Sequence, residues 1–75
     1  MIEKRCPMCG RYFTMILTDE ELESYEAYMD GDGKIQDCLP NLNPMEREFL
    51  KTGYCPECQK MLFRSKYTSE KIYED

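Results

Sequence analysis

Hydrophobic and polar positions follow a strand-like pattern first and helix-like patterns afterwards along this chain of 75 residues. Residues 11–17 (RYFTMIL) are rich in aromatic and β-branched side chains, which predicts a short strand or hairpin. From Thr18 onward the spacing becomes helical, with Leu22, Tyr25 and Met29 on one face. The pattern predicts a strand that passes directly into an amphipathic helix.

Capping signals define where two helices begin and end. Thr18 and Glu21 stand at the N-cap and N3 positions of a capping box, and two later glycines end that helix. Asn43 as N-cap, Pro44 at N1 and Glu46 at N3 mark the start of a second helix over about residues 44–52, which a glycine at position 53 closes.

The remaining segments carry weaker signals. Residues 1–5 are a short polar lead, and residues 35–42 (IQDCLPNL) predict a single helical turn interrupted by proline. Residues 58–66 have a helical composition, and their apolar run at 61–63 (MLF) is placed to cover a nearby metal site. Residues 67–75 either continue this helix or form a frayed tail.

Two short cysteine turns organise the chain. Cys6 and Cys9, in the stretch CPMCG, are three positions apart, as are Cys55 and Cys58 in CPEC. Two such turns brought together supply four sulfurs, the complete coordination shell of a structural Zn²⁺. The 45 residues between them exceed the usual ribbon spacing of about 15–20, but loop-closure entropy grows only logarithmically with length. The sequence predicts a small α+β zinc-ribbon-like domain in which two CxxC knuckles close one metal site beside two to three short helices.

The residue that follows each cysteine turn differs. Gly10 can adopt the left-handed conformation that a zinc knuckle often needs after its second cysteine. Gln59 occupies the equivalent position after the second turn and indicates that Cys58 opens a helix, whose dipole favours a metal–thiolate cluster.

Other chemistry is open to the same cysteines. Iron in a rubredoxin-like site takes four sulfurs as zinc does, so Fe remains an alternative metal. A thioredoxin-like redox pair lacks the surrounding βαβ pattern, and two disulfides would require an oxidising compartment. Cys38, the fifth cysteine, lies far from both turns and is predicted to be a small buried apolar residue.

The stretch DGDG at residues 30–33 superficially matches the middle of an EF-hand loop. Aligning its second glycine with the invariant glycine places Tyr28 and Leu39 where the loop requires carboxylates. We therefore expect Asp30 and Asp32 to belong to a turn that does not bind Ca²⁺ with useful affinity.

Composition and charge narrow the class of protein. One small domain, residues 1–75, would bury only about 60% of its unfolded surface and would need a staple such as a metal. The net charge is −5, and four thiolates around one Zn²⁺ would bring it to −7. Such a charge repels nucleic acid unless basic residues gather on one face. No apolar stretch resembles a signal peptide or a membrane helix, which predicts a cytoplasmic protein without membrane contact.

Groups that commonly perform catalysis are absent from the sequence. The chain has no histidine, the commonest general base, and no Gly-rich phosphate loop. A catalytic zinc keeps an open coordination position, whereas four cysteines close the shell. The sequence therefore predicts that the protein is not an enzyme.

Three stretches together form a specific pattern: residues 35–37 (IQD), 46–50 (EREFL) and 53–58 (GYCPEC). The pattern resembles a group of small, mostly uncharacterised bacterial and phage zinc-ribbon proteins, over roughly residues 6–63. Members of the group often carry an aromatic residue after the last cysteine, where this chain has Gln59. The resemblance implies a phage or mobile-element setting and no particular activity, and the departure at Gln59 puts a shared partner in doubt.

Three functions compete on these grounds. The leading hypothesis is a zinc-binding adaptor or inhibitor that binds a protein partner, such as a host factor, through Glu20, Glu23 and Glu26 of the first helix. A rubredoxin-like electron carrier is a lesser alternative. The other alternative is a zinc ribbon that binds nucleic acid through one basic patch. The residues of that patch would be Lys4, Arg5, Arg11, Lys60, Arg64 and Lys66.

Overall fold

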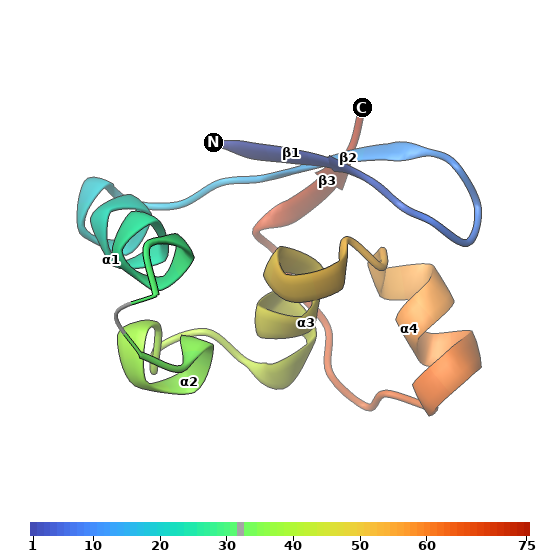
Figure 1. Cartoon of the computed structure of the whole chain (residues 1–75). Helices are drawn as coiled ribbons and strands as arrows, with labels where there is room; N and C mark the ends of the chain where they lie inside the picture. The colour runs from blue at the N-terminus through green and yellow to red at the C-terminus, as the bar shows by residue number, and fades with distance from the viewer. Residues whose placement is uncertain (32) are drawn as a thin grey trace.

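The computed structural model describes residues 1–31 and 33–75. These residues form a small α+β fold in which four helices lie on one side of a three-stranded antiparallel sheet (Figure 1). In chain order the elements are β1 (Ile2–Arg5), β2 (Tyr12–Met15), α1 (Asp19–Met29), α2 (Ile35–Cys38), α3 (Pro44–Thr52), α4 (Pro56–Phe63) and β3 (Ile72–Glu74). The fold class matches the prediction, and the fold adds a third strand to the expected hairpin and a fourth helix to the expected two to three.

The sheet has the order β1-β2-β3, with β2 in the centre. Ile2 pairs with Met15 on one side, and Ile72 pairs with Met15 on the other. Side chains alternate along a strand, so Phe13 and Met15 of β2 face the helices and are buried. The first cysteine turn joins β1 to β2 as a hairpin.

Both outer strands were assigned wrongly from the sequence. The polar lead, residues 1–5, is β1, because the turn at Cys6–Gly10 folds it back antiparallel to β2. The tail, residues 67–75, is neither helical nor frayed at its end, because residues 72–74 pair with the free edge of β2. The Thr14 hydroxyl donates to the Asp75 carboxylate at 2.5 Å and adds to this pairing.

The first helix begins as its capping box predicts. The Thr18 hydroxyl accepts from the Glu21 amide, and the Glu21 carboxylate accepts from the Thr18 amide. Tyr25 is buried as expected, but Met29 is 63% exposed because it lies at the end of the helix, beyond the core. Tyr28 takes its place, half-buried against the core with its ring 6.4 Å from that of Tyr25.

The α3 helix also begins and ends where its signals place it. Asn43 and Glu46 form the second capping box, and Gly53 closes the helix with a φ of 86°. A Cβ at Gly53 would lie 3.3 Å from the carbonyl oxygen of Arg5, so the glycine also lets β1 approach closely. Phe49 and Leu50 are almost fully buried and pack in one core with three of the knuckle cysteines, Cys6, Cys55 and Cys58.

The α4 helix differs from its prediction in start and orientation. It begins at Pro56, two residues before Cys58, and ends at Phe63. Its buried residues are Cys58 and Gln59, whereas Met61, Leu62 and Phe63 are exposed and do not cover the cysteine cluster. The reason is that α4 lies at the edge of the molecule (Figure 1), where the Phe63 ring contacts that of Tyr54, 5.9 Å between ring centres, but stays half exposed.

The segment between α4 and β3 is held by polar contacts to both capping boxes. Glu46, only 6% exposed, accepts from the Ser69 hydroxyl at 2.7 Å. Lys71 forms an ion pair with Glu21 at 2.9 Å, and the side-chain amide of Asn43 donates to the Thr68 carbonyl. These contacts position the last strand against β2.

Candidate metal centre

The first cysteine turn lies between β1 and β2. The Gly10 amide donates to the Cys6 carbonyl at 2.8 Å, and the Cys6 amide donates to the Arg11 carbonyl at the same distance. Gly10 has a φ of 75°, the left-handed conformation expected for it. This tight reversal aims the Cys6 and Cys9 sulfurs to the same side.

The second cysteine turn is the start of α4. Cys55 is the N-cap, Pro56 opens the helix, and the Cys58 amide donates to the Cys55 sulfur at 3.4 Å. The buried side-chain amide of Gln59 donates to the carbonyls of Met45, at 3.0 Å, and Tyr54, at 2.9 Å. Gln59 therefore ties the second turn to α3, which explains why a polar residue follows the cysteine.

The structure brings the four sulfurs of the two turns together. All four lie within 4.8 Å of one another, and the Cys9 and Cys55 sulfurs are 3.9 Å apart. A Zn–S bond of about 2.3 Å in a tetrahedron requires sulfurs about 3.8 Å apart. The Cys55 amide points at the Cys6 sulfur at 3.4 Å and so links the two turns directly. The donor set and its spacing fit one tetrahedral metal ion after a small contraction.

Burial and hydrogen bonding shift the thiol pKa values of the two turns in opposite directions. Burial raises the pKa of Cys6, but backbone amides, above all that of Cys55, outweigh it and bring the pKa to about 6. Hydrogen bonds from Arg11 lower the pKa of Cys9. Burial raises the pKa of both Cys55 and Cys58. The first turn thus favours thiolates, while the second keeps its protons until a cation replaces them.

Arg11 lies beside Cys9, the exposed cysteine of the cluster. It interacts with Cys9, and its guanidinium binds Glu57 at 2.6 Å and Glu74 at 3.2 Å. It also lies over the Phe13 ring, 5.7 Å from the ring centre. Arg11 therefore joins the cluster to α4 and β3, and its positive charge is already compensated within the molecule.

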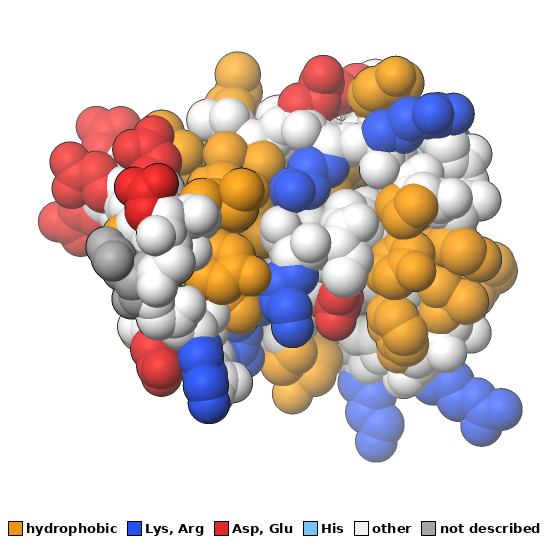
Figure 2. Space-filling view, viewed as in Figure 1, with side chains coloured by type: hydrophobic (Ala, Val, Ile, Leu, Met, Phe, Trp, Pro, Cys, Tyr) orange, Lys and Arg blue, Asp and Glu red, His pale blue; other side chains and the backbone are white. Residues whose placement is uncertain are grey.

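Of the six basic residues grouped from the sequence, Arg11 is the one engaged in ion pairs among the described residues. Arg5 donates to the Gly10 carbonyl at 3.2 Å, and Lys4 is half-buried in β1. Lys60, Arg64 and Lys66 are exposed on α4 and just beyond it. On the face seen in Figure 2 the basic side chains lie apart from one another instead of forming one patch.

The acidic residues predicted to bind a partner gather on one helix. Glu20, Glu23 and Glu26 are all exposed on α1, and acidic side chains cluster at this end of the molecule (Figure 2). In the described parts of the chain none of the three forms an ion pair.

Cys38 and Asp30 lie away from the four-sulfur cluster. Cys38 is half-buried against the core and does not belong to the four-sulfur cluster. Asp30 is the exposed C-cap of α1, and Asp32 lies outside the described residues. The absence of calcium binding stays a prediction.

Sequence reasoning missed two functional neighbours of the cluster. Arg11 was grouped with surface cations, because nothing local indicates that Glu57 and Glu74 reach it from distant segments. Gln59 was interpreted through the helix start alone, although a polar residue at a position that faces the core signals a buried hydrogen bond.

Comparison with protein-family models, with curated proteins and with solved structures found no significant match to this chain. Across residues 1–31 and 33–75 the structure has no helix with the length and apolarity that crossing a bilayer requires. The geometry of the molecule itself is therefore the basis on which its function is inferred.

Proposed function

We propose that this protein is a structural zinc-binding domain that acts as a non-enzymatic adaptor for a protein partner. The observation that carries the proposal is the cluster of four sulfurs within 4.8 Å, which leaves a tetrahedral ion no open position for a substrate. Cys6, Cys9, Cys55 and Cys58 would hold the ion, and its bonds would fasten the β1–β2 hairpin to α4.

Zinc is the metal that we assign to this site, with iron as the alternative. Elemental analysis of the purified protein should find one Zn²⁺ per chain. Visible absorption typical of a sulfur-bound iron centre would instead support an electron carrier. A folded sample without metal would contradict the proposal altogether.

The acidic face of α1, formed by Glu20, Glu23 and Glu26, is the surface that we assign to the partner. Their exposure and their spacing of three residues support a continuous negative strip that can steer a basic partner. The resemblance to bacterial and phage proteins favours a host transcription, replication or defence protein as that partner. A cytoplasmic location follows from this proposal.

The test uses the three glutamates together. Replacing all three by Gln nearly preserves helix propensity and removes three charges. Association with a partner protein captured by pull-down from the native host should then slow, and the salt dependence of the association rate should flatten. A control that removes two charges elsewhere replaces the exposed acids Asp37 and Glu70 by their amides, and the double variant Glu20→Gln with Glu23→Gln matches it in charge. An association rate unchanged by the triple replacement would contradict the acidic face as the binding site.

A direct nucleic-acid ribbon is the second candidate. Its support is the exposure of Lys60, Arg64 and Lys66 at one end of the chain's last helix. Against it stand the net charge of −5 and the ion pairs of Arg11. In that case the triple Gln replacement would strengthen binding to DNA or RNA, the opposite sign.

A further inference from the structure

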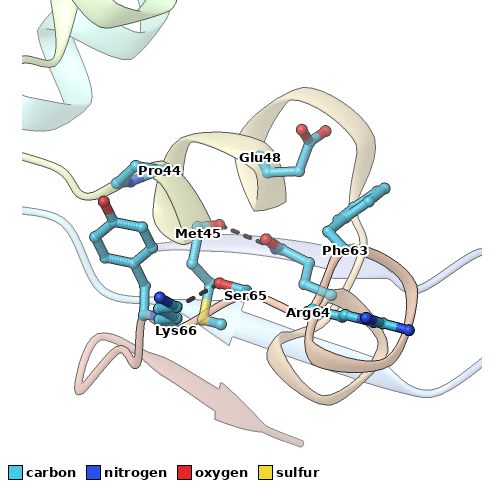
Figure 3. A pocket seen from close by; sticks show the side chains of 9 residues that line it. Pro44, Met45, Glu48, Phe63, Arg64, Ser65 and Lys66 are labelled. Atoms are coloured by element: carbon cyan, nitrogen blue, oxygen red, sulfur yellow. Dashed lines mark hydrogen bonds between the residues drawn. The ribbon is translucent and has the colours of Figure 1, made fainter.

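A second surface lies at the opposite end of the molecule from α1. A hollow of about 460 Å³ opens between α3, the end of α4 and the segment after it. Figure 3 shows Pro44, Met45 and Glu48 on the α3 side, with Phe63 and Arg64 at the end of α4. The volume falls within the range of about 300–1,000 Å³ that is usual for ligand pockets.

The floor of this groove is buried. Met45 is 1% exposed, and the Gln59 amide that donates to its carbonyl is buried as well. Arg64 has a φ of 52°, so the chain reverses directly after α4 and brings residues 65–67 back toward α3. The groove is therefore formed before anything binds.

Apolar side chains surround the groove and are open to solvent. Phe63, which is 54% exposed, and Tyr67, which is 49% exposed, line it, and Met61 and Leu62 precede them on the exposed last turn of α4. Figure 2 shows hydrophobic side chains gathered where α4 lies. Contiguous exposed apolar groups of this kind mark interaction sites.

The charge of this region is opposite to that of the whole chain. Residues 59–67 contain three basic residues and no acidic one, in a chain with a net charge of −5. Arg64 and Lys66 line the groove beside a single acid, Glu48. Within the described residues neither cation forms an ion pair, so both are available to an incoming carboxylate.

We propose that this groove binds a short acidic peptide segment of a protein partner. A bulky apolar side chain of the segment enters the hollow beside Phe63, and a neighbouring Asp or Glu binds Arg64 and Lys66. A short peptide with one or two carboxylates fits better than nucleic acid, because a chain that carries a phosphate at every nucleotide is repelled more strongly by Glu48 and by the net charge of −5. The inference rests on the proposed adaptor function, and it adds a site separate from the acidic face of α1.

Selection from a phage-displayed library of short random peptides, against the zinc-loaded protein, tests the inference. Enriched peptides should combine a bulky apolar residue with an adjacent Asp or Glu. For a dye-labelled enriched peptide, Lys66→Glu should raise Kd about tenfold or more, because it reverses a charge-assisted contact. Phe63→Ala should weaken binding as well. The matched control, Lys51→Glu, makes the same charge change at an exposed lysine outside the groove and should leave Kd nearly unchanged.

Circular dichroism and zinc content would first establish that each variant is folded. If Phe63→Ala does not fold, Lys66→Glu alone still tests the groove. Peptides that lose affinity only in the triple Gln variant of α1 would overturn the groove and leave the adaptor function standing. Failure to enrich any peptide, together with tight binding of single-stranded oligo-dT, would overturn both. Self-association that Lys66→Glu abolishes would make the groove an interface between copies of this chain, which also overturns the inference.

Discussion

The two cysteine turns share the pattern CP-x-C but have different structures. The first is the reversal of a β-hairpin, closed by Gly10 in a left-handed conformation. The second is the N-terminus of α4, with Cys55 as its cap. The residue after the second cysteine decides between these outcomes, because glycine permits a reversal whereas Gln59 continues the helix. A cysteine spacing therefore determines which sulfurs approach one another, and its neighbours determine the backbone that carries them.

The two turns differ in electrostatics as well. Amides and Arg11 surround the first turn and lower the pKa values of its thiols, whereas burial raises those of the second turn. An entering metal ion would meet two groups that favour ionisation and two that must give up protons. The four ligands are thus equivalent in chemistry but not in environment.

Removing a metal ligand should destabilise the protein more than any other single change. Cys55→Ser takes away the sulfur that lies at the junction of both turns, and structural zinc contributes about 10–16 kcal/mol in zinc-finger peptides. We expect loss of zinc and unfolding, measured by metal content and circular dichroism. Serine at Cys6, Cys9 or Cys58 should do the same, and a chelator should reproduce the effect.

Cys38→Ser is the matched control for that experiment. It places the same polar group at a half-buried position outside the cluster and should cost about 1–3 kcal/mol while zinc stays bound. A Cys55→Ser protein that remains folded and stable without metal would show that the metal ion is not needed to stabilise the fold.

Gln59→Leu should have the next largest effect. It leaves the carbonyls of Met45 and Tyr54 without their donor, which costs about 1–3 kcal/mol in the free energy of unfolding. Urea denaturation of the zinc-loaded protein measures the loss. Lys60→Leu, at the exposed neighbouring position, should change stability by no more than about 0.5 kcal/mol. Equal stability of the two variants would show that Gln59 does not anchor the second turn.

Gly10→Ala tests the first turn. A side chain in the left-handed conformation costs about 1–2 kcal/mol, and here its Cβ would also lie 3.3 Å from the Arg5 guanidinium. Gly31→Ala is the control, since Gly31 has a similar positive φ of 91° and a Cβ there would have no non-neighbouring atom of the described residues within 4 Å. Both should lower stability, but only Gly10→Ala should alter the absorption spectrum of the Co²⁺-substituted protein. If the Co²⁺ spectrum of Gly10→Ala is the same as that of the unchanged protein, Gly10 does not determine the geometry of the metal site.

Arg11→Met should have the smallest effect. Its ion pairs with Glu57 and Glu74 are exposed, and such pairs contribute about 1 kcal/mol or less. The apolar stem of methionine keeps packing near Phe13. The difference in unfolding free energy between Arg11→Met and the unchanged protein should shrink as salt is raised, because salt screens exposed charges. A difference that persists in high salt would assign Arg11 a structural role beyond charge.

Local signals predicted part of this fold well. The capping box at Thr18, the N-cap at Asn43 and the helix end at Gly53 each follow from a few neighbouring residues, and the structure confirms them. The approach of the four cysteines was also predicted, because sulfur chemistry links distant turns. Such features depend on interactions within one helical turn or on a single demanding ligand set.

Strand pairing was not accessible in the same way. The segments at residues 2–5 and 72–74 are only four and three residues long, and they are strands because β2 offers them two edges. The exposure of the apolar turn at Met61–Phe63 depends on where α4 ends relative to α3, which periodicity alone does not encode. For the candidate site, the ligands followed from spacing, whereas the roles of Arg11 and Gln59 required the folded structure.

The position of the two turns also has a consequence for folding kinetics. Joining them closes a loop of 45 residues, an entropic cost of about 3 kcal/mol for a flexible chain. The β1–β2 hairpin needs only local contacts, so it can form early and present two thiolates to a metal ion before α4 arrives. Capture of the second turn would then be the slow step, and the folding rate would stop depending on metal concentration once the hairpin has bound its ion.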